Sequence, residues 1–176
     1  MNRIAAICLL LLAVASPAQA EQAAGLSWTA PTAWTSQGER PMRAATYVIP
    51  AAKGDKEPAE LAVFFFGQGQ GGPADANVKR WIDQFRKADG SSAESVAAVK
   101  KETLAGLPAM TLDVKGTYLG GGPQMGGGAP KPGYRLLGAI VEGPGGNLYF
   151  KLTGPEKTVA EAAPPFRKML EGIKKK

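Results

Sequence analysis

The sequence predicts an α+β protein in which an antiparallel β-sheet of about six strands is flanked by two main helices. Strand-like segments are separated by short turns, which favours hairpins and meanders and therefore antiparallel pairing. Two further segments carry apolar residues at helical spacing, so each has one face that must pack against a core. The predicted order β-β-α-β-β-β-β-α contains no internal repeat and is typical of the α+β class.

The chain begins with the features of a secretory signal peptide. Arg3 gives a positive start, and residues 4–15 form an apolar run that is too short to span a bilayer as a helix. Ala18 to Ala20 then has the small-x-small form of a cleavage site. We expect cleavage after Ala20 and export, either to a periplasm or out of the cell. Cys8 lies inside the apolar run, which disfavours a lipoprotein.

The predicted mature chain is one domain, residues 45–176, preceded by an extended lead-in over 21–44. In this lead-in, Trp28 and Trp34 are the expected apolar anchors. No second long apolar run follows the leader, so no transmembrane segment is expected in the mature chain.

Two residue types that carry much of enzyme and metal chemistry are missing from the predicted mature chain. The sequence has no histidine, and its single cysteine is removed with the leader. This excludes a Ser-His-Asp triad, a Cys-His pair, zinc sites built from thiolate or imidazole, and haem held by histidine. The carboxylates are scattered singly, without metal-loop spacing. We therefore expect no catalytic residues, no metal and no cofactor.

The net charge of +6 comes from dispersed lysines and arginines. An excess of this size allows weak binding to anionic surfaces, although ordinary solubility is the favoured explanation. No basic stripe alternates with aromatic residues, so nucleic acid is not an expected partner.

The first half of the domain is predicted to contain two strands and a helix. Strands are expected over 45–50 and 59–67, with a polar turn between them. The helix is expected to start at Asp75 or Asn77, either of which can cap it, and to end at Asp89. Its apolar stripe at i, i+3, i+4 and i+7 comprises Val78, Trp81, Ile82 and Phe85.

The second half is predicted to contain four strands, a loop and a closing helix. The Gly/Pro-rich segment 120–133 is expected to be a surface loop, because glycine entropy and proline geometry both oppose regular structure there. Pro164 and Pro165 are expected to break or kink the closing helix, which starts at Pro155. The terminal Lys174–Lys176 are expected to complement its negative end. The four strands are predicted over 95–106, 107–119, 134–143 and 147–154.

Between the second strand and the first helix, Gly67, Gly69 and Gly72 match the pattern G-x-G-x-x-G of dinucleotide-binding loops. Pro73 keeps the third glycine outside the helix, and the elements that follow predict an antiparallel meander rather than a parallel βαβ unit. No Gly-Lys-Ser/Thr follows, so a P-loop is excluded as well. The motif therefore predicts a sharp strand-to-helix turn, not a nucleotide site.

A polar recognition surface is the alternative interpretation of this loop. Gln68 and Gln70 offer amide donors and acceptors, and Arg80 offers a planar fork for an anion. Asn77 lies one helical turn before Arg80, near the positive end of the helix. The candidate binding residues are Gly67, Gln68, Gly69, Gln70, Gly71, Gly72, Asn77 and Arg80, with Met125 at the tip of the 120–133 loop.

Several segments together resemble a family of uncharacterised exported bacterial proteins whose fold is similar to those of PsbP, the photosystem II extrinsic subunit, and Mog, a nuclear-transport factor. They cover about residues 40–172 and include ATYVIP, AELAVFFFGQGQGG, NVKRWIDQF, GTYL, YRLLGAIVEGPGGNLYFKLTGP and TVAEAAPPFRKML. The resemblance implies an antiparallel sheet flanked by helices. It implies no catalytic residues, because the fold serves mainly in binding or assembly.

The function that these observations favour is an exported, non-catalytic domain that binds a protein or envelope component through the 67–80 surface. One rival is an enzyme using carboxylate, lysine or tyrosine chemistry, for instance Tyr118 or Tyr134 beside Lys131 or Arg135. Another is a carrier for a small molecule or lipid, which would need a hollow between sheet and helix. A cleft with convergent polar groups and shifted pKa values favours an enzyme, whereas a flat exposed patch favours a protein-binding module.

Overall fold

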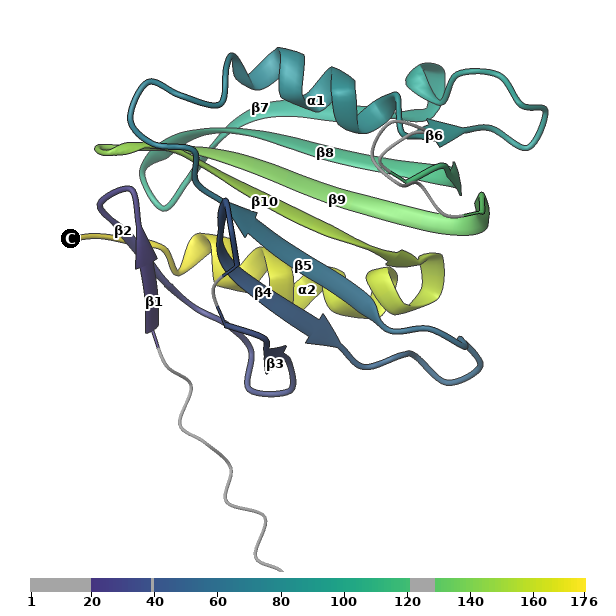
Figure 1. Ribbon diagram of the computed structural model, residues 1–176, viewed down its shortest axis with the longest axis horizontal. Coiled ribbons are helices and arrows are strands. Elements are labelled where there is room, and N and C mark those ends of the chain that lie inside the picture. Colours follow the sequence, from purple (N-terminus) through teal and green to yellow (C-terminus); the bar gives the residue numbers. More distant parts are fainter. Residues whose placement is uncertain (1–19, 39, 121–128) are drawn as a thin grey trace, which may run out of the picture.

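The computed structural model describes residues 20–38, 40–120 and 129–176 (Figure 1). Residues 1–19 of the predicted leader and Met125 lie outside this range, whereas Ala20 is part of the first strand. The helices are α1 (Ala74–Ile82) and α2 (Glu156–Glu171), with the short 3-10 helix η1 (Glu94–Val96). The strands are β1 (Ala20–Ala23), β2 (Leu26–Thr29), β3 (Thr35–Ser36), β4 (Arg43–Ile49), β5 (Ala59–Phe64), β6 (Phe85–Arg86), β7 (Ala98–Leu104), β8 (Leu107–Tyr118), β9 (Lys131–Gly143), β10 (Gly146–Pro155) and β11 (Lys174–Lys175).

Eight strands form the main sheet, in the order β3-β4-β5-β10-β9-β8-β6, with β7 paired to β8 as well. All pairings in the described part of the chain are antiparallel. The predicted α+β class with two main helices is confirmed, and the sheet is larger than the six strands expected. The three longest strands, β8 to β10, form its centre, and the short turn between the strands predicted over 134–143 and 147–154 makes β9 and β10 a hairpin.

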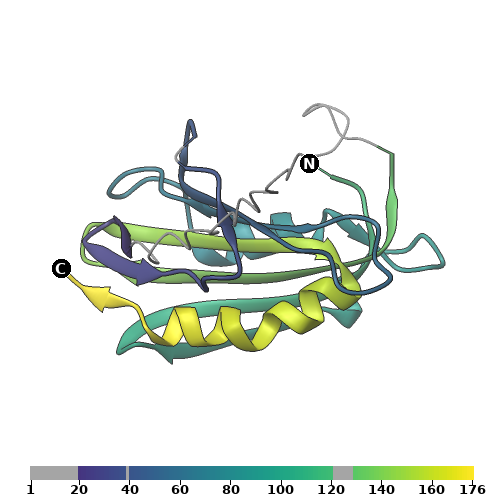
Figure 2. The ribbon, with the colours of Figure 1, turned by 90° about the horizontal axis from the view of Figure 1, so that it is seen from below.

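The two helices cover opposite faces of the sheet (Figures 1 and 2). Alternation along β10 shows this, because successive side chains of a strand point to opposite faces. Leu148 and Phe150 belong to the apolar cluster beneath α2, whereas Tyr149 belongs to the cluster beneath α1. No helix in the described residues is long and apolar enough to cross a membrane.

Helix α1 is shorter than the sequence predicts. It begins after Pro73 without a side-chain cap, since the Asp75 carboxylate accepts only from the neighbouring amide of Ala76. It ends at Ile82, and Phe85 instead forms β6 by pairing with Tyr118. Phe85 is nevertheless fully buried in the same cluster as Trp81, so the apolar stripe was identified correctly although its last member is not helical.

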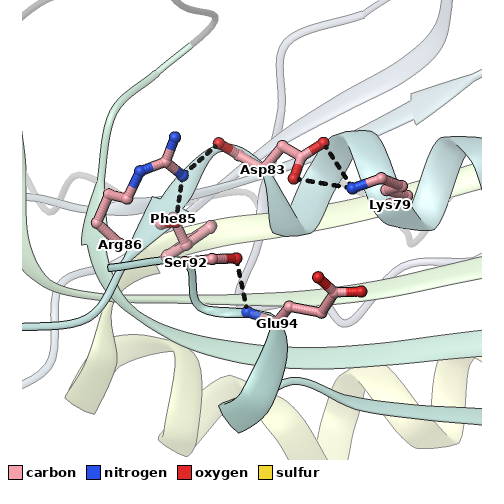
Figure 3. Close-up of polar contacts among 6 residues, drawn as sticks. All are labelled: Lys79, Asp83, Phe85, Arg86, Ser92 and Glu94. Atoms are coloured by element: carbon pink, nitrogen blue, oxygen red, sulfur yellow. Dashed lines mark hydrogen bonds and ion pairs between the residues drawn. The ribbon is translucent and has the colours of Figure 1, made fainter. Parts of the chain in front are cut away.

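Local polar contacts hold the chain where it leaves α1 (Figure 3). Lys79 and Asp83 form an i, i+4 ion pair at 3.4 Å on the exposed side of the helix. Arg86 donates from one guanidinium nitrogen to the backbone oxygens of Asp83 and Phe85, at 3.0 and 2.8 Å. Arg86 thus ties the C-cap residue Asp83 to the start of β6.

Helix α2 is continuous through Pro164 and Pro165, so the predicted break is absent. Each proline removes one backbone donor, and the carbonyls left without a partner belong to Ala160 and Glu161. Both of these residues are exposed, as is Pro164, so water can satisfy the freed carbonyls. Burial of the opposite face, which includes Phe166 at 4% exposure, favours the helix.

The lead-in and the C-terminus are more ordered than an extended segment. β1, β2 and β11 form a small second sheet, in which Lys174 pairs with Ser27 and Lys175 with Leu26. The terminal lysines therefore continue into a strand rather than only complementing the end of α2. The predicted apolar anchors Trp28 and Trp34 are both buried in the cluster beneath α2.

The start of α2 is fixed from a distance by Asp55, and removal of this carboxylate should destabilise the fold. Asp55 Oδ2 accepts from the backbone amide of Thr158 at 2.9 Å and from its hydroxyl at 2.6 Å. We expect Asp55→Ala to lower the free energy of unfolding by about 1–2 kcal/mol, as loss of a cap does. Asp75→Ala is the matched control, with an expected change below about 0.5 kcal/mol. Urea unfolding of both variants checks this, and equal effects would contradict a capping role for Asp55.

Candidate functional site

The glycine loop is a tightly packed turn. Gly67, Gly69, Gly71 and Gly72 all have positive φ angles. A Cβ atom at Gly71 would lie 2.5 Å from the Tyr149 hydroxyl oxygen, so this position needs glycine for close approach as well as for its backbone conformation. Tyr149 in turn donates to the carbonyl of Gly72 at 3.2 Å. The strands on either side of β5 both run antiparallel to it, so the described fold has no parallel βαβ unit for a dinucleotide.

Asn77 is a buried structural residue of this turn, whereas most of the other predicted recognition residues are exposed. It is 3% exposed, and its amide donates to the carbonyls of Gly71 at 2.7 Å and Pro73 at 2.9 Å. Its Oδ1 accepts from Arg80 at 2.8 Å. Gln68, Gly69, Gln70 and Arg80 are exposed, and Met125 lies outside the described residues.

Asn77→Ala should therefore act on stability. The substitution leaves the Gly71 carbonyl without its donor and removes one of the two donors to the Pro73 carbonyl, which keeps the backbone amide of residue 77, so we expect unfolding to become easier by about 1–3 kcal/mol. Gln70→Ala, at an exposed position in the same turn, should change stability by less than about 0.5 kcal/mol. Thermal unfolding of the two variants measures the difference, and an Asn77→Ala protein as stable as wild type would show that this amide is dispensable to the turn.

A cleft of about 310 Å³ lies on the α1 face of the sheet. Its location follows from strand alternation, because Lys151 and Thr153 point to the same side of β10 as Tyr149. Lys151 is flanked by Ala62 on β5 and Gly138 on β9, and the Trp81 ring covers Gly138, so the cleft opens on the Ala62 side. The lining residues are Arg43, Glu57, Pro58, Glu60, Ala62, Phe64, Tyr118, Gly120, Ala129, Lys131, Tyr134, Lys151 and Thr153.

The charges in the cleft are unequally compensated. Arg43 forms an ion pair with Glu60 at 2.8 Å, and Lys131 forms one with Glu57 at 2.6 Å. Lys151 contacts no carboxylate in the described part of the chain and donates instead to the neutral Oε1 of Gln84 at 2.6 Å. The cleft therefore carries one positive charge that neither ion pair neutralises.

Among the cleft residues, Lys151 also has the pKa that departs most from its ordinary value. Burial, together with repulsion from Arg43, lowers the pKa of its ammonium group to about 8, although Glu60 acts in the opposite direction. A binding anion would stabilise the charged form and raise this pKa again. Lowered lysine pKa values in a cleft are typical of functional sites.

Two tyrosines form an aromatic wall beside these charges. The Tyr118 and Tyr134 rings are stacked with centroids 5.9 Å apart. The Lys151 ammonium lies 5.6 Å from the Tyr118 centroid, and that of Lys131 lies 5.4 Å from the Tyr134 centroid. Burial raises the pKa of both phenols, and Tyr134 also donates to Glu57. Both hydroxyl groups thus stay protonated at neutral pH, and because the Tyr134 proton is already donated to Glu57, Tyr118 is the phenol that can donate to a ligand.

Sequence reasoning identified part of this group of residues. Tyr118, Tyr134 and Lys131, considered as enzyme candidates, do come together, whereas Arg135 points to the other face and pairs with Asp113 at 2.7 Å. Lys151 was missed, although a lysine between Phe150 and Leu152 in a buried strand is a usable signal. No group of three or more His, Cys, Asp or Glu side chains suited to a metal ion occurs among the described residues.

Comparison with known proteins shows that the chain shares its fold with a protein of known structure. No protein-family model matches the chain, and no curated protein matches it either. The solution structure of cyanobacterial PsbP (CyanoP) from Synechocystis sp. PCC 6803 is similar, with a TM-score of 0.55, 14% identity, and coverage of 97% of this chain and 98% of that one. A crystal structure of a protein of unknown function from Pseudomonas aeruginosa has a TM-score of 0.47 and 14% identity, with coverage of 87% and 93%. The chain therefore has a PsbP-like fold.

Proposed function

We propose that the protein is an exported, non-catalytic domain that binds a small organic anion in the cleft on the α1 face. The observation that carries this proposal is Lys151, a half-buried cation without an ion-pair partner in the described structure. Keeping such a charge away from water is costly. An anionic ligand would offset that cost, and Lys131 and Arg43 would add further donors at the walls.

The dimensions and lining of the cleft support a ligand of modest size with a flat apolar part. Its volume is at the lower end of the range for ligand sites. Tyr118 and Tyr134 offer ring faces for stacking. A small aromatic carboxylate or phosphate combines the charge and the ring that this lining would accommodate.

Calorimetric titration with phenyl phosphate and benzoate at pH 7 tests this proposal. We expect binding of at least one of them by the wild-type protein, and a loss of affinity of about tenfold or more in Lys151→Met. Lys101→Met, an exposed position on β7, is the matched control and should bind like wild type. Wild-type affinity should fall as the pH rises past 8, where Lys151 loses its charge. Equal affinities in all three proteins would contradict the proposal.

The glycine-loop surface remains a second candidate, as a contact site for a protein or envelope component. The observation that favours it is Phe66, which is 37% exposed directly before Gln68 and Gln70. An aromatic residue beside polar side chains is typical of interface centres. Cross-linking pull-downs from the native envelope, with wild type beside Arg80→Glu, test this surface. A partner captured equally by both baits would exclude it.

We also propose that the chain belongs to the exported bacterial family that it resembles and that its leader is removed after Ala20. The signal-peptide features of residues 1–20 and the PsbP-like fold support this assignment. Amino-terminal sequencing of the protein from its native cells should begin at Glu21. A sequence that begins at Met1 would contradict export by this leader.

A further inference from the structure

We infer that Lys151 captures carbonyl-bearing anions as a reversible imine, which makes aldehydes and ketones with a carboxylate or phosphate group the ligand class of the cleft. This inference rests on the proposed function, because the anionic group must first be held in the same cleft. It adds a covalent step that simple anion binding does not require.

The position of the Lys151 amine favours such a step. Its backbone lies in the central part of β10, paired on both sides with β5 and β9, which fixes the starting point of the side chain. Its nitrogen contacts a neutral amide oxygen of Gln84 at 2.6 Å and no carboxylate in the described structure. No ion pair therefore has to break before the nitrogen turns toward a ligand.

The amine is also available in its nucleophilic form. With a pKa of about 8, about a tenth of Lys151 is neutral at pH 7, compared with well under a thousandth of an exposed lysine. Lowered lysine pKa values of this kind accompany imine-forming lysines. Lys131, the other lysine of the cleft, is held as an ammonium ion, because its hydrogen bond to Glu57 raises its pKa. Lys131 is thus suited to binding the anionic group, and Lys151 to attacking the carbonyl.

The chemistry balances with groups present in the cleft. The neutral Lys151 nitrogen forms a C–N bond to the carbonyl carbon while the C=O π bond breaks, and the oxygen takes a proton from the Tyr118 phenol. The nitrogen returns a proton to the phenolate, which gives a carbinolamine. Protonation of its hydroxyl by the same phenol then releases water as the nitrogen lone pair forms the C=N bond, and the remaining N–H proton returns to Tyr118. The net products are an imine and one water molecule, with no redox change.

The test uses pyridoxal phosphate, which carries an aldehyde, a phosphate and an aromatic ring, and pyridoxine phosphate, its analogue without the carbonyl. The purified protein is incubated with pyridoxal phosphate and followed by imine absorbance. It is then reduced with borohydride and mapped by peptide mass spectrometry. The variants are Lys151→Arg, which keeps the positive charge but cannot form the imine, and Lys101→Arg, at an exposed position on β7 outside the cleft, as the matched control. Circular dichroism confirms that all three proteins are folded.

We expect saturable labelling at Lys151, at least tenfold faster than at any other lysine, that is lost in Lys151→Arg and retained in Lys101→Arg. Pyridoxine phosphate should compete with the labelling and should bind to wild type and to Lys151→Arg. Binding of pyridoxine phosphate without preferential labelling of Lys151 would overturn the imine and leave anion binding intact. Failure of both compounds to bind in the cleft would overturn the imine and count against the proposed function as well.

Discussion

Replacing Trp28 with alanine is expected to lower the free energy of unfolding by about 3–5 kcal/mol. Trp28 is 1% exposed and packs edge-on against Phe150, with ring centroids 5.6 Å apart. Its indole nitrogen donates to the Tyr47 hydroxyl at 2.9 Å in the interior. The substitution therefore leaves a large cavity and removes the indole donor from a buried hydroxyl. It also removes the larger of the two β2 side chains buried in the main core, the other being Leu26.

Thermal and urea unfolding measure this effect. In a domain of this size, we expect the melting temperature to fall by about 10 °C. Met42→Ala, at a side chain that is 71% exposed, is the control and should stay within about 0.5 kcal/mol of wild type. Tyr47→Phe separates the two contributions, because it leaves no cavity and removes only hydrogen bonds, those of the hydroxyl with Trp28 and Glu21; it should cost about 1–2 kcal/mol. A loss below about 1 kcal/mol for Trp28→Ala would show that the lead-in adds little to the domain.

Replacing Lys151 with methionine is expected to stabilise the protein at pH 7 by about 1–2 kcal/mol. The folded state lowers the pKa of this lysine from 10.5 to about 8, so its charged form is disfavoured by folding. The full shift would correspond to about 3 kcal/mol, and the partial exposure of the side chain reduces this figure. Methionine keeps the length of the side chain without the charge.

The stability difference between Lys151→Met and wild type should depend on pH. Below pH 8 both the folded and the unfolded chain hold the Lys151 proton, so the cost of the charge is fully present in wild type. Between pH 8 and 10.5 the unfolded chain binds more protons, and the stability contributed by this group rises with pH. The advantage of Lys151→Met should therefore shrink over that interval. A variant less stable than wild type at pH 7, or a difference constant up to pH 10.5, would contradict the burial of an uncompensated charge.

Regular alternation and apolar spacing predicted the centre of the fold well. The strand over 107–119 alternates clearly and corresponds to β8, and the predicted hairpin forms β9 and β10. The segments that were missed are short and depend on distant partners. β6 and β11 have two residues each, and β11 exists because Lys174 and Lys175 reach β2 from the opposite end of the chain. Such pairings leave no local pattern in the sequence.

The residues of the cleft were harder still to predict from local sequence patterns than the short strands. The glycine motif is a local pattern, so it attracted attention, but its glycines serve the turn: all have positive φ angles, and Gly71 alone is also required by close packing against Tyr149. The cleft draws its residues from five strands, from the segment before β5, and from Gly120 and Ala129 between β8 and β9. Only the register of the sheet brings Glu57 to Lys131 and leaves Lys151 without a carboxylate. A lysine within a buried strand was visible in the sequence at Lys151. Its role could not be inferred, because that role depends on which side chains surround it in the fold.

An amide chemical-shift titration with phenyl phosphate tests the central claim most directly, because it reports where an anion binds as well as whether it binds. Anion binding in the cleft predicts saturable shifts around Tyr118, Lys131, Tyr134 and Lys151, and their loss in Lys151→Met. The 67–80 surface should stay unchanged. Shifts confined to that surface, or scattered over exposed lysines without saturation, would contradict the assignment of the cleft as the binding site.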